Sequence, residues 1–175
     1  QVAGRAQRRV GGDPRVAVRY GIVAALDVMV PMRGGIRLAF DVHRPGADGA
    51  FAEGRFPTLM CHTPYDKTTQ RYVEIADWFV PRGYNVVLVD MRDRYGSEGS
   101  GTYFHSATPH TGRDGYDIVE WIASQPWSNG RVGTFGLSYP GAVQWLAAGQ
   151  SPPHLVAMVP AMTYASPTHF WYTGG

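Results

Sequence analysis

The chain has 175 residues, of which 44% are hydrophobic and 17% are charged, a composition typical of one globular domain with a substantial core. It holds no run of about 18 apolar residues and no apolar signal-peptide core at its start, so neither a membrane span nor an uncleaved leader is predicted. The formal net charge of +2 is misleading, because residues 1–20 carry the positive excess and the rest of the chain has a charge of about −2.

The N-terminal segment carries most of the positive charge. Residues 1–20 include five arginines and a single acid, Asp13. We expect residues 1–20 to form a loose basic arm, because a nucleic-acid site needs a larger basic footprint with aromatic side chains. Cys61 is the only cysteine, which excludes an intrachain disulfide, and its apolar neighbours predict a small buried hydrophobe. The compartment stays open, with the cytoplasm and a processed secreted form as the alternatives.

The first elements in chain order are predicted strands. Residues 28–42 predict two strands joined by the turn Gly34-Gly35, because apolar side chains alternate after the turn. A Pro- and Gly-rich loop is expected at residues 44–56, followed by an apolar strand at 56–61. Helical spacing over residues 72–79 predicts a helix that ends at Pro81 and Gly83.

The remaining elements alternate in type. The run at 84–90 is continuously apolar and predicts a strand that is buried on both faces. A polar loop is expected at 91–110, and Thr111 with Asp114 resembles a capping box before a helix at 116–124. Strands at 131–135 and 155–160 enclose a helix at 140–148. The pattern predicts an α/β fold with a mostly parallel sheet and helices on both faces.

The segment Gly-Leu-Ser-Tyr-Pro-Gly at 136–141 lies between the predicted strand at 131–135 and the helix that follows. That placement is typical of a nucleophile elbow, a sharp turn that lifts a serine hydroxyl above the end of a sheet. The segment therefore predicts that Ser138 is the nucleophile of a serine hydrolase, with the backbone N–H of Tyr139 as one oxyanion donor. The second donor is expected from the loop 64–67, through either a backbone N–H or the hydroxyl of Tyr65.

Six short motifs together resemble one known family. They are Pro-Tyr-Asp-Lys at 64–67, Gly-Tyr-Asn-Val-Val-Leu-Val-Asp-Met-Arg at 83–92, Tyr-Gly-Ser-Glu-Gly at 95–99, Asp-Gly-Tyr-Asp-Ile-Val-Glu-Trp-Ile at 114–122, Gln-Pro-Trp-Ser-Asn-Gly at 125–130 and the elbow at 136–141. In this order they resemble the X-Pro dipeptidyl-peptidase class of α/β-hydrolases. That class includes cocaine-esterase-like acyl esterases and α-amino-acid ester hydrolases.

The resemblance implies a role for each matching residue. Ser138 would be the nucleophile, and the Tyr65 hydroxyl and the Tyr139 N–H would form the oxyanion hole. One departure is Asp93, which stands where the family usually has glycine, so the loop after Asp90 is expected to differ in shape.

The sequence lacks two members of a catalytic triad. α/β-Hydrolases carry the triad in the order Ser, Asp, His, yet residues 139–175 contain no Asp or Glu. Of the two later histidines, His154 is expected in a loop. His169 lies beside Phe170 and Trp171, and we expect all three to line an apolar substrate pocket, with an interface as the alternative for His169. We therefore expect residues 21–175 to be the N-terminal part of a hydrolase domain, completed by the remainder of the same polypeptide.

The expected substrate is a small ester or amide, with an acyl esterase favoured over an X-Pro dipeptidyl-peptidase or an α-amino-acid ester hydrolase. A non-catalytic α/β module is the alternative from another class. No cofactor is expected. A metal site is not expected either, because His105 and His110 lie five residues apart in a loop without an acidic partner.

Overall fold

The strands form one mixed sheet in the computed structural model, which describes residues 17–100 and 109–164. Within these ranges the sheet order is β1-β2-β5-β4-β6-β7, and β3 pairs with β2. The strands are β1 (Gly21–Pro31), β2 (Arg37–Ala47), β3 (Ala50–Phe51), β4 (Phe56–Thr63), β5 (Asn85–Asp90), β6 (Ser128–Leu137) and β7 (Leu155–Ala161). The helices are α1 (Gln70–Phe79), the short 3-10 turn η2 (Val80–Arg82), α2 (Pro109–Ser124) and α3 (Tyr139–Ala148).

The predicted hairpin is confirmed at one edge of the sheet. β1 and β2 pair antiparallel, and the turn between them uses Gly35 at φ 81°, a conformation that glycine adopts without steric penalty. A bulge interrupts β1 between Ala25 and Val28. β2 runs to Ala47, further than predicted, so the loop expected at 44–56 is shorter and contains the small strand β3.

The rest of the sheet is parallel, as the alternating pattern predicted. β4 pairs parallel with both β5 and β6, and β6 pairs parallel with β7, whereas β2 runs antiparallel to β5. The carboxyl ends of β4, β5, β6 and β7 therefore meet at one edge of the sheet. Ligands of open α/β sheets bind at this edge, and here it holds the loop after β4 and the turn after β6.

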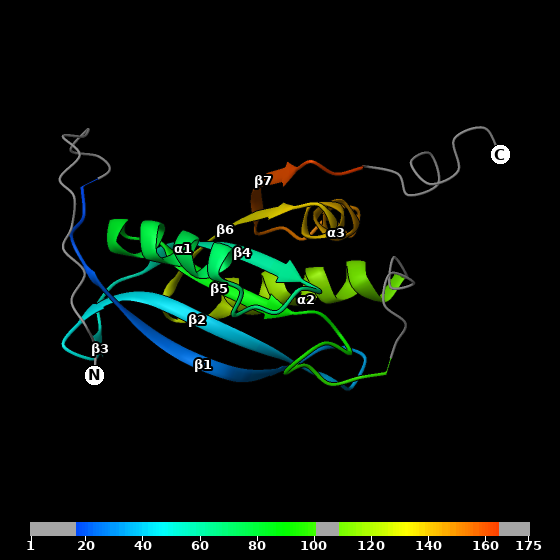
Figure 1. The fold of residues 1–175 in the computed structure, drawn as a ribbon, viewed down its shortest axis with the longest axis horizontal. Coiled ribbons are helices and arrows are strands. Elements are labelled where there is room, and N and C mark those ends of the chain that lie inside the picture. The colour runs from blue at the N-terminus through cyan, green and yellow to red at the C-terminus, as the bar shows by residue number, and fades with distance from the viewer. Residues whose placement is uncertain (1–16, 101–108, 165–175) are drawn as a thin grey trace.

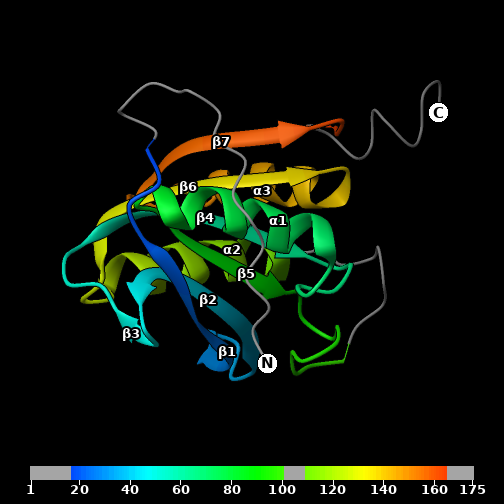
Figure 2. The ribbon, with the colours of Figure 1, turned by 60° about the vertical axis from the view of Figure 1, so that its left-hand side comes forward.

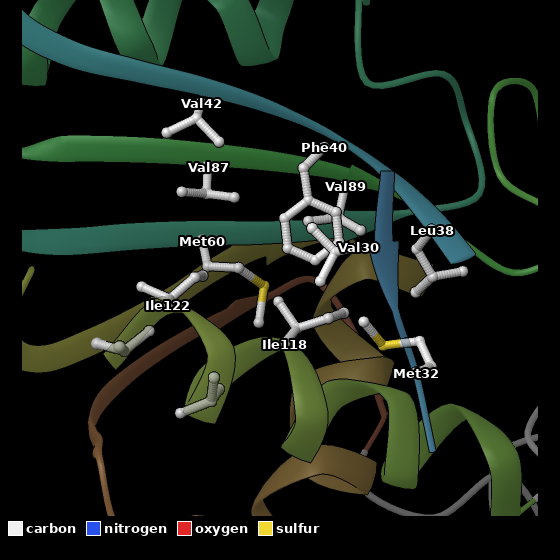
Figure 3. Close-up of a cluster of buried hydrophobic side chains, with 12 residues drawn as sticks. Val30, Met32, Leu38, Phe40, Val42, Met60, Val87, Val89, Ile118 and Ile122 are labelled. Atoms are coloured by element: carbon white, nitrogen blue, oxygen red, sulfur yellow. The ribbon is translucent and has the colours of Figure 1, made fainter. Parts of the chain in front are cut away.

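Helices cover both faces of the sheet (Figures 1 and 2). α1 packs its Tyr72 and Ala76 against Cys61 and Leu88 on one face. On the other face, Ile118 and Ile122 of α2 point toward the sheet, as Figure 3 shows. The strand side chains of this cluster come from β1, β2, β4, β5 and β6: Val30, Leu38, Phe40, Val42, Met60, Val87, Val89 and Val132. Burial on both faces explains why β5 is apolar along most of its length, with all six residues buried.

The prediction for the start of α2 was wrong. The helix begins at Pro109 rather than near residue 116, so Thr111 lies inside it and no capping box forms there. The Asp114 carboxylate instead accepts hydrogen bonds from the Arg92 guanidinium, at 2.7 and 3.0 Å. Proline suits the first turn of a helix because the N–H groups of that turn have no partner within it.

Two further regions complete the description. Most of the predicted basic arm lies outside the described residues, but the N–H groups of Arg19 and Tyr20 donate to the Pro81 carbonyl at 2.8 and 3.2 Å. β7 is the outer strand on the side of the sheet opposite the β1–β2 hairpin, and its Val156 and Val159 are exposed. Among the described helices, none has the length and apolar character needed to cross a bilayer.

Candidate active site

Ser138 occupies a sharp turn between β6 and α3. Its backbone has φ 66° and ψ −123°, a combination that residues other than glycine seldom adopt and that costs about 1–3 kcal/mol. The Ser138 N–H donates to the Ala161 carbonyl at the end of β7, and its own carbonyl accepts from Gly141 and Ala142 in α3. The residue is exposed at the carboxyl edge of the sheet. This strained, exposed turn joins a strand to a helix at the position where the nucleophile elbow is predicted.

The two glycines of the motif are there because the chain passes close to itself. A Cβ on Gly136 would lie 2.5 Å from the Pro140 Cβ and 2.6 Å from the Pro140 carbonyl oxygen. A Cβ on Gly141 would lie 2.8 Å from the Thr163 side chain. The spacing of glycine at 136 and 141 therefore fits this particular turn, in which proline occupies position 140.

The buried side chain of Gln144 ties the turn to two strands. Its Nε2 donates to the carbonyls of Pro140 at 3.1 Å and Val159 at 3.2 Å, and lies 3.5 Å from that of Gly136. Its Oε1 accepts from the Thr134 hydroxyl at 2.9 Å and from the Val159 N–H at 3.2 Å. A fully bonded buried amide holds one arrangement of its partners, so Gln144 fixes α3 against β6 and β7. No local pattern in the sequence indicates this role of Gln144.

The structure brings Tyr65 and Tyr139 into one cluster. Tyr139, the first residue of α3, is 4% exposed and packs with Met91 and Val143, and half-buried Tyr65 packs against the same group. The loop that holds Tyr65 is anchored at both sides. The Tyr65 N–H donates to the Thr63 hydroxyl at 3.0 Å, and its carbonyl accepts from the Thr69 hydroxyl at 2.7 Å. Both proposed oxyanion residues thus lie at the same edge of the sheet as Ser138.

Asp93 takes a conformation that glycine favours. Its φ is 64°, and its N–H donates to the Glu98 carbonyl at 3.0 Å. Asp is one of the few residues that tolerate positive φ, because its short polar side chain bonds locally. The aspartate at this position is therefore compatible with a turn that a glycine would serve.

Neither His62 nor His154 is placed as an accessible base for Ser138. His62, on β4, is buried, and that burial lowers its pKa to about 4. The His154 Nδ1 lies 2.7 Å from the Glu120 carboxylate, just before β7 begins. The Ser138 N–H donates to the carbonyl of Ala161, at the other end of β7. The two ends of β7 are about 20 Å apart at about 3.3 Å per residue, so His154 is far from Ser138.

Other predicted residues fall into two groups. His169, Phe170 and Trp171 lie outside the described residues, as does His105, so their predicted roles stay predictions. His110 is exposed in α2, and the described part of the chain contains no group of three side chains able to hold a metal. Cys61 is buried as predicted, and burial raises the pKa of its thiol well above the usual value.

Fold and turn together define an α/β-hydrolase, in which a serine follows a central parallel strand and precedes a helix. Residues 34–175 match the family described as X-Pro dipeptidyl-peptidase (S15 family). The chain belongs to this family, as the resemblance of its motifs predicted.

Individual relatives agree with this assignment. The chain is 40% identical to a cocaine esterase of Rhodococcus sp. over 161 residues, which are 86% of the chain and 26% of that protein. Its fold is similar to that of a CocE/NonD family hydrolase from Staphylococcus aureus, with a TM-score of 0.69 and 28% identity over 87% of the chain and 33% of that structure. An α-amino acid ester hydrolase aligns with a TM-score of 0.66 and 25% identity over 90% of the chain and 27% of that structure. The chain spans about a quarter of the length of the curated relatives it matches.

Proposed function

We propose that the polypeptide containing this chain is a serine hydrolase that cleaves an ester through an acyl-enzyme on Ser138. The observation that carries the proposal is the backbone of Ser138, which is strained and exposed at the carboxyl edge of the sheet. Strain of this kind persists only where the surrounding structure enforces it, and it gathers at functional sites. Tyr65, Ser138 and Tyr139 are all retained at this edge of the sheet, which argues against a module without catalysis.

The proposed oxyanion hole uses two donors, the backbone N–H of Tyr139 and the hydroxyl of Tyr65. Tyr139 begins α3, where the positive end of the helix dipole favours a developing negative charge. Tyr65 packs against the same cluster as the Tyr139 side chain, at the end of the neighbouring strand β4. In this proposal the two donors approach one carbonyl oxygen from adjacent loops, as stabilisation of a tetrahedral intermediate requires.

The proposed reaction has two halves. A base takes the proton of the Ser138 hydroxyl while the oxygen attacks the ester carbonyl, and the base then returns that proton to the leaving alcohol. Water, deprotonated by the same base, releases the acid and frees Ser138. Because residues 139–175 contain no Asp or Glu and His154 lies at the far end of β7, we propose that the rest of the polypeptide supplies the Asp and the His.

An ester is favoured over a peptide for one reason: the curated relatives are named esterases. The apolar residues Phe170 and Trp171, with His169, are proposed to line the acyl pocket. An X-Pro dipeptidyl-peptidase or an α-amino-acid ester hydrolase is the alternative, because the family description and one solved structure carry those names. Both alternatives require recognition of a free amino group. Turnover of an uncharged aryl ester but not of an Ala-Pro anilide separates the acyl esterase from them.

Labelling with a fluorophosphonate probe, followed by mass spectrometry of the full-length polypeptide, tests the nucleophile. We expect one adduct, located on Ser138, and none in the Ser138→Ala variant. Ser124→Ala is the matched control, because this exposed serine in α2 donates only to the Trp121 carbonyl, and its variant should label like the wild type. Folded wild-type protein that remains unlabelled would refute the proposal.

A second experiment tests the hydroxyl donor. Tyr65→Phe removes only the hydroxyl, and we expect kcat to fall by roughly 10²–10³-fold with a small change in KM. Tyr84→Phe is the control, because Tyr84 packs edge-on against Phe79 beside the amino end of β5, away from Ser138. Wild-type kcat in the Tyr65 variant would remove its hydroxyl from the mechanism and leave the role of Ser138 standing.

A further inference from the structure

A buried lysine lies two residues after Tyr65, and nothing in the proposed reaction uses it. The Lys67 ammonium is 2.7 Å from a carboxylate oxygen of Asp27 and 3.0 Å from one of Asp41, and its side chain is only 5% exposed. Lysine is rarely buried unless it is paired. Burial lowers the pKa of Lys67, but the hydrogen bonds to the two carboxylates outweigh that effect and the pKa is raised, so the ammonium stays charged.

The bulge in β1 contains Asp27, one of the two acids that pair with Lys67. Asp27 has φ 53°, and its N–H donates to the Asp41 carboxylate at 3.0 Å. This arrangement turns the Asp27 side chain onto the Lys67 ammonium from outside, while Asp41 reaches it from within the sheet. Two strands of the N-terminal hairpin thus hold one side chain of the loop after β4.

The backbone of Lys67 is held as well. Its N–H donates to the Asp90 carboxylate at 2.8 Å, at the end of β5, and the second oxygen of Asp90 accepts from Gly96 at 3.2 Å. Asp66, between Tyr65 and Lys67, has φ 73°, a conformation open to few residues. With Lys67 fixed at both its side chain and its backbone, little freedom remains for Tyr65.

We infer that Lys67 is a positioning residue, whose ammonium, clamped by Asp27 and Asp41, holds the loop so that the Tyr65 hydroxyl stays at the oxyanion site. The inference rests on the proposed role of Tyr65 and deepens it. The clamp acts on the transition state more than on bound substrate, because the oxyanion forms only when Ser138 attacks. Loss of the clamp therefore lowers kcat and leaves KM nearly unchanged.

A double-mutant cycle on the full-length polypeptide tests this coupling. Lys67→Met should lower kcat by about 10–100-fold, because a displacement of about 1 Å in a catalytic group has effects of that size. In the Tyr65→Phe background the same substitution should change kcat by less than about twofold, since the hydroxyl that it positions is gone. An equal fold-loss in both backgrounds, or no loss of kcat from Lys67→Met where Tyr65 is intact, overturns the inference.

Two further variants separate positioning from stability. Lys67→Met leaves the buried Asp41 carboxylate without its cation, so Lys67→Met with Asp41→Asn removes the pair with less effect on folding. That double variant should show the same loss of kcat, and Lys67→Arg should restore most of the activity. Arg33→Met is the matched control, because it breaks an ion pair with Asp117 on the exposed side of α2 and should keep wild-type kcat.

The outcome for Lys67 is distinguishable from that for the proposed function. If fluorophosphonate does not label Ser138 in the folded wild type, the hydrolase proposal fails. If Ser138 is labelled but the Lys67 and Tyr65 substitutions act independently, only the positioning role of Lys67 fails.

Discussion

Replacing the buried imidazole of His62 with an uncharged amide should remove a pH-dependent loss of stability. His62 is 4% exposed on β4 and lines a cavity of about 10 Å³, room for about one water molecule. Burial lowers the pKa of His62 to about 4, with Asp114 opposing and Arg92 adding to the shift. As the pH falls, the imidazole is therefore protonated at a higher pH in the unfolded chain than in the folded protein.

The size of the effect follows from the two pKa values. His62 titrates near 6.5 when unfolded and near 4 when folded, so its contribution is fully present above about pH 6.5 and declines as the pH falls toward 4. Well below pH 4 both states bind the proton and no further loss occurs. Between pH 7.5 and pH 5 the loss is about 2 kcal/mol, and by pH 4 it reaches about 3 kcal/mol.

The assay is urea unfolding of the wild type and of His62→Gln at several pH values in this window. The free energy of unfolding of the wild type should fall faster with decreasing pH than that of the variant, by about the amounts above. His110→Gln is the control, because His110 is exposed in α2 and its replacement should leave the pH dependence unchanged. Parallel curves for the wild type and His62→Gln would show that the imidazole is not desolvated as described.

Two further substitutions test the backbone of the site. Gly136→Ala places a methyl group 2.5 Å from the Pro140 Cβ, so the turn has to open: we expect at least about 3 kcal/mol loss of stability by chemical denaturation and no fluorophosphonate labelling of Ser138 in the protein that remains folded. Normal labelling in that variant would contradict the close approach. At Asp93, with φ 64°, replacement by glycine should keep or raise the melting temperature, whereas replacement by alanine should lower the free energy of unfolding by about 1 kcal/mol. A more stable alanine variant would refute the assigned conformation.

Most of the fold could be predicted because its signals are local. Apolar runs bounded by Gly and Pro marked β4, β5, β6 and β7, and their alternation with helices predicted parallel pairing. The turn at Ser138 was predictable for the same reason, since the glycines at 136 and 141 and the strand before them are adjacent in sequence. The start of α2 was misplaced because Thr111 and Asp114 have cap spacing, and Pro109 was the signal that marked the true start.

The supporting contacts of the site could not be predicted, because they join distant residues. Lys67 meets Asp27 and Asp41 across 40 and 26 positions of the chain, and nothing in the local sequence indicates that a lysine after Tyr65 is buried. Gln144 likewise looks like any polar residue in a helix until β7 is placed beside it. An alternation pattern reports which face of an element is buried but not which polar side chain on that face bonds to which partner.

The position of β4 between β5 and β6 has a consequence for how the protein acquires its reactive serine during folding. β4 and β6 are neighbours in the sheet, although α1, β5 and α2 separate them along the chain. Contacts between segments so far apart form more slowly than those of the β1–β2 hairpin, whose strands are joined by a short turn. The Tyr65 loop and the Ser138 turn therefore come together only once β6 has joined the sheet. The rate at which refolding protein becomes reactive toward fluorophosphonate would then report how fast the sheet is completed. We expect this step to follow the formation of the β1–β2 hairpin.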